Sequence, residues 1–202
     1  VTLEPGAGMI IKAVAGGGGR GTRVVSHADQ LESAYARCQS EAKAAFGRGD
    51  VFVEELIAPA RHIEVQVVAD MHGNVTHVGE RECSVQRRYQ KLIEIAPAPN
   101  LSESTRSTIT EAAVRLASAV GYVNLGTFEF LIYGESEPSQ CAFIETNSRL
   151  QVEHTVSEAV MGVDLVQAQI KLAAGAKLSS LGLSPDTVTS PRGFAIQARV
   201  NM

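Results

Sequence analysis

The sequence predicts an α+β fold with mainly antiparallel sheets, and two kinds of pattern support this. Strand-like segments at residues 61–69 and 75–80 flank a turn, as do residues 126–133 and a strand that begins at Cys141. Strands joined by short turns form antiparallel hairpins. Two long segments also carry apolar residues at steps of three or four, which is the period of an amphipathic helix. The 202 residues are enough for one large domain or for two small ones.

The first predicted strand, residues 9–15, contains a single charge, Lys12, and leads into four glycines at positions 16–19. Glycine runs let backbone N–H groups approach phosphate oxygens closely. The glycines match G-x-G-x-x-G, but a dinucleotide site needs a helix directly afterwards, whereas residues 22–25 resemble a strand. A Walker loop needs Gly-Lys-Ser/Thr, which is absent. The remaining interpretations are a glycine-rich hairpin over a nucleotide and a flexible linker, and a charge inside an apolar strand favours the hairpin.

Apolar periodicity predicts two long helices. Ser26 is expected to cap the first, which runs to about Phe46 and ends at Gly47. Ser102 is expected to cap the second, which Gly121 closes. The other expected elements are a strand at residues 51–55, a short helix from His154 to Met161, a helix at residues 165–174 capped by Asp164, and a strand at residues 194–200.

Polar and apolar side chains alternate along residues 61–69, so that one face of this strand is polar. That face carries His62, Glu64 and Gln66. Residues 81–96 are expected to connect strands of the same sheet, and they place Gln86 and Lys91 close in sequence to this face. The charged composition of residues 81–96 is equally typical of a solvated loop.

A second polar row is predicted within residues 141–154. If this segment stays extended, every second side chain shares a face, and these side chains are Glu145, Asn147, Arg149, Gln151 and Glu153. The preceding hairpin can place Glu129 beside Glu145, and two adjacent carboxylates repel unless a cation lies between them. Mg²⁺ suits such a place, because it binds a few carboxylates together with phosphate oxygens. The alternatives are a solvated strand face and structural pairing of the carboxylates with nearby arginines.

Composition excludes several classes of function. A net charge of −4 and 5% aromatic residues give no indication of nucleic acid binding. No apolar run approaches the roughly 20 residues that span a membrane. The three cysteines form no CxxC pair and are expected to be buried thiols in a reducing cytosol. The start resembles neither a signal peptide nor an initiator, so the chain is expected to be a fragment of a longer protein.

These motifs together resemble the biotin carboxylase branch of the ATP-grasp enzymes, and within it pyruvate carboxylase and the single-chain acyl-CoA carboxylases. The matching segments, in the family's order, are IIKAVAGGGGRGTRVV, ARHIEVQVVAD, GERECSVQRRYQK, GTFEF, FIETNSRLQVEH and AIQARVN. The resemblance implies an ATP-grasp fold in which two α+β subdomains grip a nucleotide. Residues 1–57 are implied to form a small lid with the glycine hairpin, and residues 58–202 to hold the metal, bicarbonate and biotin sites. An N-terminal α/β domain and a C-terminal part of the full-length enzyme are expected to lie outside this chain.

The implied reaction uses ATP to phosphorylate bicarbonate to carboxyphosphate, whose CO₂ is captured by biotin on a carrier domain. The residues implied to bind ATP are Lys12, Gly16, Gly17, Gly18, Gly19, Glu54, Ile57, His62 and Gln86. Those implied to hold Mg²⁺ or Mn²⁺ are Glu129, Glu145 and Asn147. Those implied to bind bicarbonate are Lys91, Arg149, Gln151 and Val152. The implied catalytic set is Glu153 as the base, Lys91 and Arg149 on bicarbonate, and Arg199 on the biotin enolate.

Two positions depart from the family pattern. Tyr89 replaces the usual histidine and Glu55 replaces a common hinge lysine, so neither is given a contact to the nucleotide. The implied partners are a biotinylated carrier domain and a carboxyltransferase domain of the same enzyme, with a homo-oligomer at full length and no nucleic acid or membrane. The expected location is the cytoplasm, or the mitochondrial matrix in a eukaryote. The isolated fragment is expected to be weakly active or inactive.

Two other functions stay open at this point. One is another ATP-grasp ligase, for example one that resembles carbamoyl phosphate synthetase, which should lack the run from Arg149 to Glu153 and Arg199. The other is a nucleotide-binding module without catalysis, which the loss of Glu129, Glu145 or Glu153 would favour. All of these residues are present in the sequence.

Overall fold

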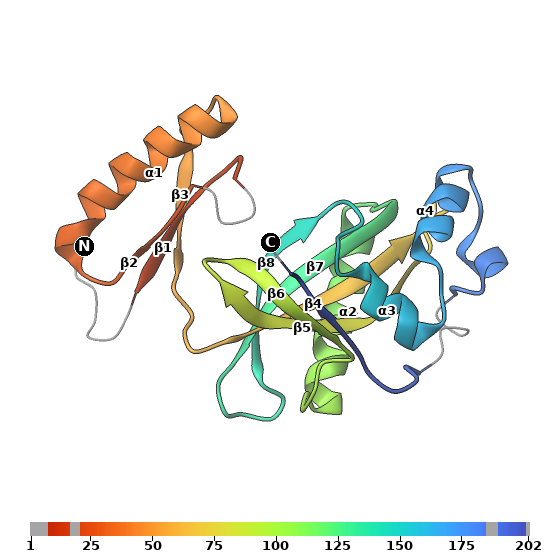
Figure 1. The fold of residues 1–202 in the computed structure, drawn as a ribbon. Coiled ribbons are helices and arrows are strands. Elements are labelled where there is room, and N and C mark those ends of the chain that lie inside the picture. The colour runs from red at the N-terminus through yellow and green to blue at the C-terminus, as the bar shows by residue number, and fades with distance from the viewer. Residues whose placement is uncertain (1–7, 17–20, 185–189, 201–202) are drawn as a thin grey trace. The chain divides into compact units, whose positions relative to one another are not determined.

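The computed structural model describes residues 8–16, 21–184 and 190–200, so that Gly17, Gly18 and Gly19 lie outside the described residues. The chain divides into two compact units (Figure 1). Unit 1 consists of residues 1–59 and 87–90, and unit 2 of residues 60–86 and 91–202. Each unit combines an antiparallel sheet with helices, which confirms the predicted α+β class.

Unit 1 is a three-stranded sheet covered by one helix. The strands lie in the order β2-β1-β3, with bounds Thr22–Val25, Met9–Ala13 and Val51–Glu55. Helix α1, Leu31–Phe46, packs on the sheet through a small core. That core consists of Ile11, Val25, Ala34 and Cys38. The first strand therefore ends two residues before the predicted boundary, and Gly16 follows it outside the sheet.

The start of α1 differs from the prediction, whereas its end agrees. A 3₁₀ turn, Ala28–Gln30, precedes the helix, and neither segment has a side-chain cap. The prediction that Ser26 caps the helix is wrong, because the turn begins after His27 and moves the helix start further along the chain. Gly47 ends the helix as predicted, since its φ of 75° is left-handed and glycine adopts it without a steric penalty.

Unit 2 contains a six-stranded sheet in the order β8-β7-β4-β5-β6-β9. The bounds are β4 Arg61–Ala69, β5 Val75–Arg87, β6 Gln90–Ala96, β7 Asn124–Tyr133, β8 Gln140–Asn147 and β9 Ala195–Ala198. Its α-helices are α2 Glu103–Ala119, α3 His154–Met161 and α4 Leu165–Ala173, and a 3₁₀ turn spans Leu178–Leu181. Both predicted hairpins, β4–β5 and β7–β8, are confirmed.

The two faces of this sheet are buried in different ways. Helix α2 covers one face, where Ile63, Val65 and Phe128 pack against Ile109 and other apolar residues of the helix (Figure 1). Helices α3 and α4 pack on residues of the opposite face, including Val68 and Leu125. The polar residues that precede Val68 by even steps on β4 share this second face. The face is thus apolar at one end and ionic at the other.

Residues 81–96 differ from the prediction of a connecting segment. Strand β5 continues to Arg87 and strand β6 begins at Gln90, so that the segment consists mostly of two neighbouring strands. Arg88 and Tyr89 form the turn between them, and both have positive φ, 52° and 64°. The charges in these strands are tolerated because many of them meet charges of opposite sign, as the next subsection describes.

The remaining predicted caps are confirmed. Ser102 accepts a hydrogen bond from the backbone N–H of Thr105 at the start of α2. Asp164 accepts one from Gln167 at the start of α4. Within the described part of the chain, no helix is both long and apolar enough to cross a membrane.

Candidate functional site

Three carboxylates lie in a row across strands β4, β7 and β8. Glu64 is opposite Glu129 in the register of β4 and β7, and Glu129 is opposite Glu145 in the register of β7 and β8. Side chains at opposed positions of neighbouring strands lie close together on one face. This register confirms that Glu129 and Glu145 share a face, and Glu64 extends the row by one strand.

Glu129 has the largest number of polar contacts in this row. Its Oε1 accepts hydrogen bonds from Lys91 Nζ at 3.0 Å, Asn147 Nδ2 at 2.8 Å and Gln151 Nε2 at 3.3 Å. His62 Nε2 lies 2.7 Å from its Oε2. Burial opposes ionisation, but the contacts with His62 and Lys91 outweigh it and lower the pKa of Glu129 to about 2. Glu129 is therefore an anion at neutral pH although it is buried.

The ammonium of Lys91 lies among three of the carboxylates. It forms an ion pair with Glu64, another with Glu129 at 3.0 Å and a third with Glu153 at 2.8 Å. Burial acts to lower the pKa of Lys91, but Glu64 and the other carboxylates outweigh it and raise that pKa. The ammonium of Lys91 is therefore shared by three carboxylates, and two of them, Glu64 and Glu153, also pair with an arginine.

Sequence reasoning missed the residue beneath this cluster, Arg81. Its side chain is fully buried, and its Nε donates to Glu64 Oε1 at 2.7 Å. Its other nitrogens donate to Gln66 at 2.9 Å, Ser157 at 3.0 Å and Thr127 at 3.3 Å. The available signal was the predicted polar face of residues 61–69, because a buried Glu64 needs a cationic partner.

Glu153 connects the cluster to Arg199, the residue that follows the edge strand β9. Its Oε1 faces Lys91, and its Oε2 accepts a hydrogen bond from Arg199 Nη2 at 2.8 Å. Burial raises the pKa of Glu153, but Lys91 outweighs this effect, so that the net direction is downward. The carboxylate is thus ionised and able to accept a proton.

The extended backbone ends earlier than the polar alternation suggested. Strand β8 stops at Asn147, and the following residues turn, with the Arg149 N–H donating to the Asn147 carbonyl at 2.8 Å. The prediction that one extended face continues to Glu153 is therefore wrong. Arg149 is exposed, and its Nη1 donates to the Leu150 carbonyl at 3.3 Å. Val152 is exposed as well.

Two predicted glutamines, Gln151 and Gln86, contact residues of the cluster. Gln151 is buried beside Glu129, and its Oε1 has no hydrogen-bond partner among the described residues. Gln86 Nε2 lies 2.7 Å from His62 Nδ1, which links the end of β5 to the carboxylate row. A buried amide oxygen without a partner is costly, so Gln151 has an unused acceptor for a ligand that brings a donor.

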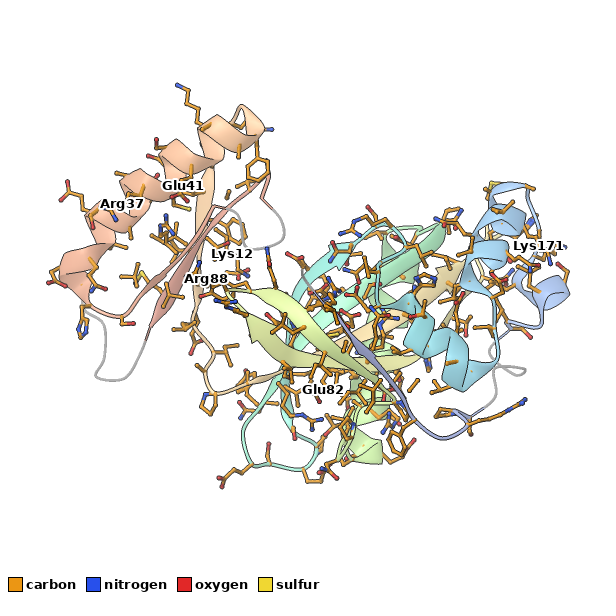
Figure 2. The ribbon with its side chains drawn as sticks, viewed as in Figure 1. Lys12, Arg37, Glu41, Glu82, Arg88 and Lys171 are labelled. Carbon is orange, nitrogen blue, oxygen red and sulfur yellow. The ribbon has the colours of Figure 1, made fainter. Side chains whose placement is uncertain are left out.

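Two of the predicted nucleotide residues of unit 1, Lys12 and Glu54, lie on its sheet. Lys12 extends from β1, while Arg37 and Glu41 lie along α1 (Figure 2). Lys12 forms an ion pair with Glu54 of the neighbouring strand β3. Ile57 is half-buried just after β3.

The residues predicted to bind metal fit a hard divalent cation. Asn147 Nδ2 lies 2.8 Å from a Glu129 oxygen and 3.3 Å from a Glu145 oxygen, so the space between the carboxylates already attracts a positively polarised group. Carboxylate and amide oxygens are the ligands that Mg²⁺ prefers. A half-turn of the Asn147 amide would present its oxygen in place of its nitrogen.

Comparison with known proteins shows the family. Residues 2–181 match the family of carbamoyl-phosphate synthase L chain ATP-binding domains. The chain belongs to this family. Pyruvate carboxylase 1 of Caenorhabditis elegans is 54% identical to it over 195 residues, which are 96% of this chain and 16% of that protein. The chain thus spans about a sixth of the curated relatives that it matches.

Solved structures show which branch of the family this fold resembles. The biotin carboxylase of Campylobacter jejuni, solved as a complex with β-γ-ATP, is 50% identical with a TM-score of 0.86. The biotin carboxylase domain dimer of a Hydrogenobacter thermophilus 2-oxoglutarate carboxylase, with MgADP, ADP and bicarbonate, is 43% identical with a TM-score of 0.86. Each match covers 95% of this chain and 41% of the other. The predicted ATP-grasp fold of a biotin carboxylase is confirmed.

Proposed function

We propose that this chain is the central part of a biotin carboxylase module, which uses ATP and bicarbonate to carboxylate biotin on a carrier domain. The observation that carries the proposal is the buried ion network that joins Glu153 to both Lys91 and Arg199. It combines an ionised base with two cations, and a small oxyanion substrate requires both. The biotin carboxylases and pyruvate carboxylases similar to this chain support the same reaction.

ATP would be bound by residues of the lid, 1–57, and by residues of the larger part, 58–202. Lys12 and the glycines at positions 16–19 would hold its phosphates, and the backbone at Glu54 and Ile57 would meet adenine. His62 and Gln86, which already contact one another, would line the pocket. Phosphoryl transfer depends on positioning and charge neutralisation more than on covalent chemistry, and these residues supply both.

Glu129, Glu145 and Asn147 would hold Mg²⁺ or Mn²⁺. When bound, the ion would neutralise charge on the phosphate oxygens during transfer. The low pKa of Glu129 supports this role, because its carboxylate needs no deprotonation before it binds a cation.

Bicarbonate would bind to Lys91, Arg149, Gln151 and the backbone of Val152. A guanidinium suits a planar oxyanion because it can donate two parallel hydrogen bonds. Glu153 would take the proton of bicarbonate while an oxygen of bicarbonate attacks a phosphorus atom of ATP. Its lowered pKa ensures that it is unprotonated and makes it a weak base, so proton transfer would accompany the attack.

Arg199 would face the ureido oxygen of biotin and stabilise negative charge there. The carrier domain and a carboxyltransferase domain would belong to the same full-length protein, acting as a homo-oligomer in the cytoplasm or, in a eukaryote, in the mitochondrial matrix. Two fully buried thiols, Cys38 and Cys83, support a reducing compartment.

The test is ADP release by the full-length protein, which should require both bicarbonate and biotin. Glu153→Gln should lower the rate about a hundredfold or more, since it removes the base. Arg149→Ala should lower it about tenfold or more, since it removes a substrate cation. Matched controls are Glu111→Gln and Arg115→Ala, whose side chains are 69% and 71% exposed on α2. Full activity in both site variants would overturn these roles.

The family description favours a second candidate, an ATP-grasp ligase of the carbamoyl phosphate type. It would activate bicarbonate in the same way but deliver it to ammonia. Ammonia-dependent and biotin-independent formation of carbamoyl phosphate would select this candidate. ATP binding without ADP release under either condition would indicate a non-catalytic module.

A further inference from the structure

Arg199 is fixed on two sides by carboxylates from different elements. Its Nε donates to Glu94 Oε1 at 2.6 Å, and its Nη2 donates to Glu153 Oε2 at 2.8 Å. Its backbone N–H also donates to the Leu92 carbonyl at 2.9 Å. Backbone and side chain are therefore both anchored to strand β6, which pairs with β9 just before Arg199.

Glu94 is an unusual residue for the inside of a sheet. It is fully buried, and its Oε2 has no hydrogen-bond partner among the residues that the structure describes. Burial raises the pKa of Glu94, and Arg199 only partly opposes this. A buried carboxyl group with half of its acceptors unused is costly, and within the described residues its side chain accepts a hydrogen bond from Arg199 alone.

We propose that Glu94 is a positioning residue, which holds the Nε–H edge of Arg199 so that the guanidinium bridges to Glu153 and leaves Nη1 for the ureido oxygen of biotin. The inference rests on the proposed function, because it concerns how Arg199 meets the carboxyl acceptor. Within the described part of the chain, the side-chain hydrogen bonds of Arg199 use only Nε and Nη2. A carboxyl group in either charge state can accept the Nε–H, so the role does not depend on ionisation.

The arrangement explains how an arginine that directly follows a short edge strand is held in place. Strand β9 has four residues and pairs with β6 along one side. Thr155 Oγ1 donates to Gln197 Oε1 at 2.5 Å, which ties β9 to the start of α3 directly after Glu153. Without Glu94, Nη2 of Arg199 would keep its bond to Glu153, but the guanidinium would be free to rotate about that single contact.

A double-mutant cycle in the full-length protein tests this, with biotin-dependent ADP release as the readout. Glu94→Ala and Arg199→Ala should each lower kcat about tenfold or more. In the Arg199→Ala background, Glu94→Ala should have an effect below about twofold, because the residue that it positions is gone. Glu94→Gln keeps an acceptor oxygen and should retain activity within about threefold of the wild type.

Glu80→Ala is the matched control, because Glu80 is also a buried carboxylate of the same sheet but pairs with Arg106. Glu80→Ala should change kcat by the same factor in the wild-type and the Arg199→Ala backgrounds, as expected for a loss that is structural. Independent, multiplying effects of Glu94→Ala and Arg199→Ala would overturn the inference while leaving the proposed function intact. If the wild type shows no biotin-dependent ADP release, both the inference and the proposed function are contradicted. If Glu94→Ala does not fold, Glu94→Asp replaces it in the cycle, because aspartate withdraws the carboxylate by one methylene. The same two outcomes then support or contradict the inference.

Discussion

Two strand lysines, one in each unit, hold their charge in different ways. Among the residues that the structure describes, Lys12 on β1 pairs with Glu54 alone, and these side chains are 20% and 36% exposed. Lys91 on β6 pairs with three carboxylates that are at most 6% exposed. Water screens an exposed pair, whereas breaking a buried pair leaves charges without solvent. Breaking the ion pair of unit 1 therefore costs little free energy, while the ions of unit 2 are held together by several buried contacts.

Replacing each lysine by methionine tests this comparison directly. Lys91→Met should lower the free energy of unfolding by about 3–5 kcal/mol, because three buried carboxylates then each lose their contact with the same ammonium. Lys12→Met should lower it by less than about 1 kcal/mol. Urea unfolding with equal m values in the two variants measures the difference. Equal losses of unfolding free energy in the two variants would contradict the difference between the buried and the exposed ion pairs.

Acid should weaken unit 2 through Glu129. The folded pKa of about 2 lies below the ordinary value of 4.5, so the ionised form stabilises the fold above pH 4.5. Converted through linkage, this contribution is roughly 3 kcal/mol, and it should disappear as the pH falls from 4.5 towards 2. Urea unfolding between these pH values measures it. Glu129→Gln should flatten the slope in that window, and the exposed Glu111→Gln should leave it unchanged; a Glu129→Gln slope equal to that of the wild type contradicts the assignment.

Mg²⁺ binding should depend on the carboxylate pair rather than on overall charge. Millimolar Mg²⁺ should raise the thermal midpoint of the wild type, because a ligand that binds only the folded state stabilises it. Glu145→Gln should weaken Mg²⁺ affinity about tenfold, or about 1.4 kcal/mol. Glu135→Gln removes the same charge from the exposed loop of the same hairpin and should have no such effect. Equal weakening by both variants would point to nonspecific screening.

The sequence was sufficient for features that depend on local pattern. Alternation and turn spacing predicted that Glu129 and Glu145 meet, and apolar periodicity predicted the long helices. Alternation does not show where a strand stops, which is why Arg149 was placed on an extended face that ends at Asn147.

The buried cations and their partners could not be predicted from local pattern. Arg81 and Glu64 are 17 positions apart, and Arg199 and Glu94 are 105 apart. Whether such a charge is buried depends on a partner that only the folded sheet brings near. A charged residue in a strand therefore indicates either a solvated face or an internal ion pair, and composition does not distinguish them.

The smallest expected effect compares the helix starts of the two units. Ser102 caps α2 through the Thr105 N–H, whereas Ser26 caps nothing in α1 because a 3₁₀ turn intervenes. Ser102→Ala should lower the free energy of unfolding by about 1 kcal/mol, and Ser26→Ala by less than about 0.5 kcal/mol. Urea unfolding of the two variants measures both. If Ser26→Ala costs as much as Ser102→Ala, the serine caps the first helix in solution and the helix begins earlier than the structure places it.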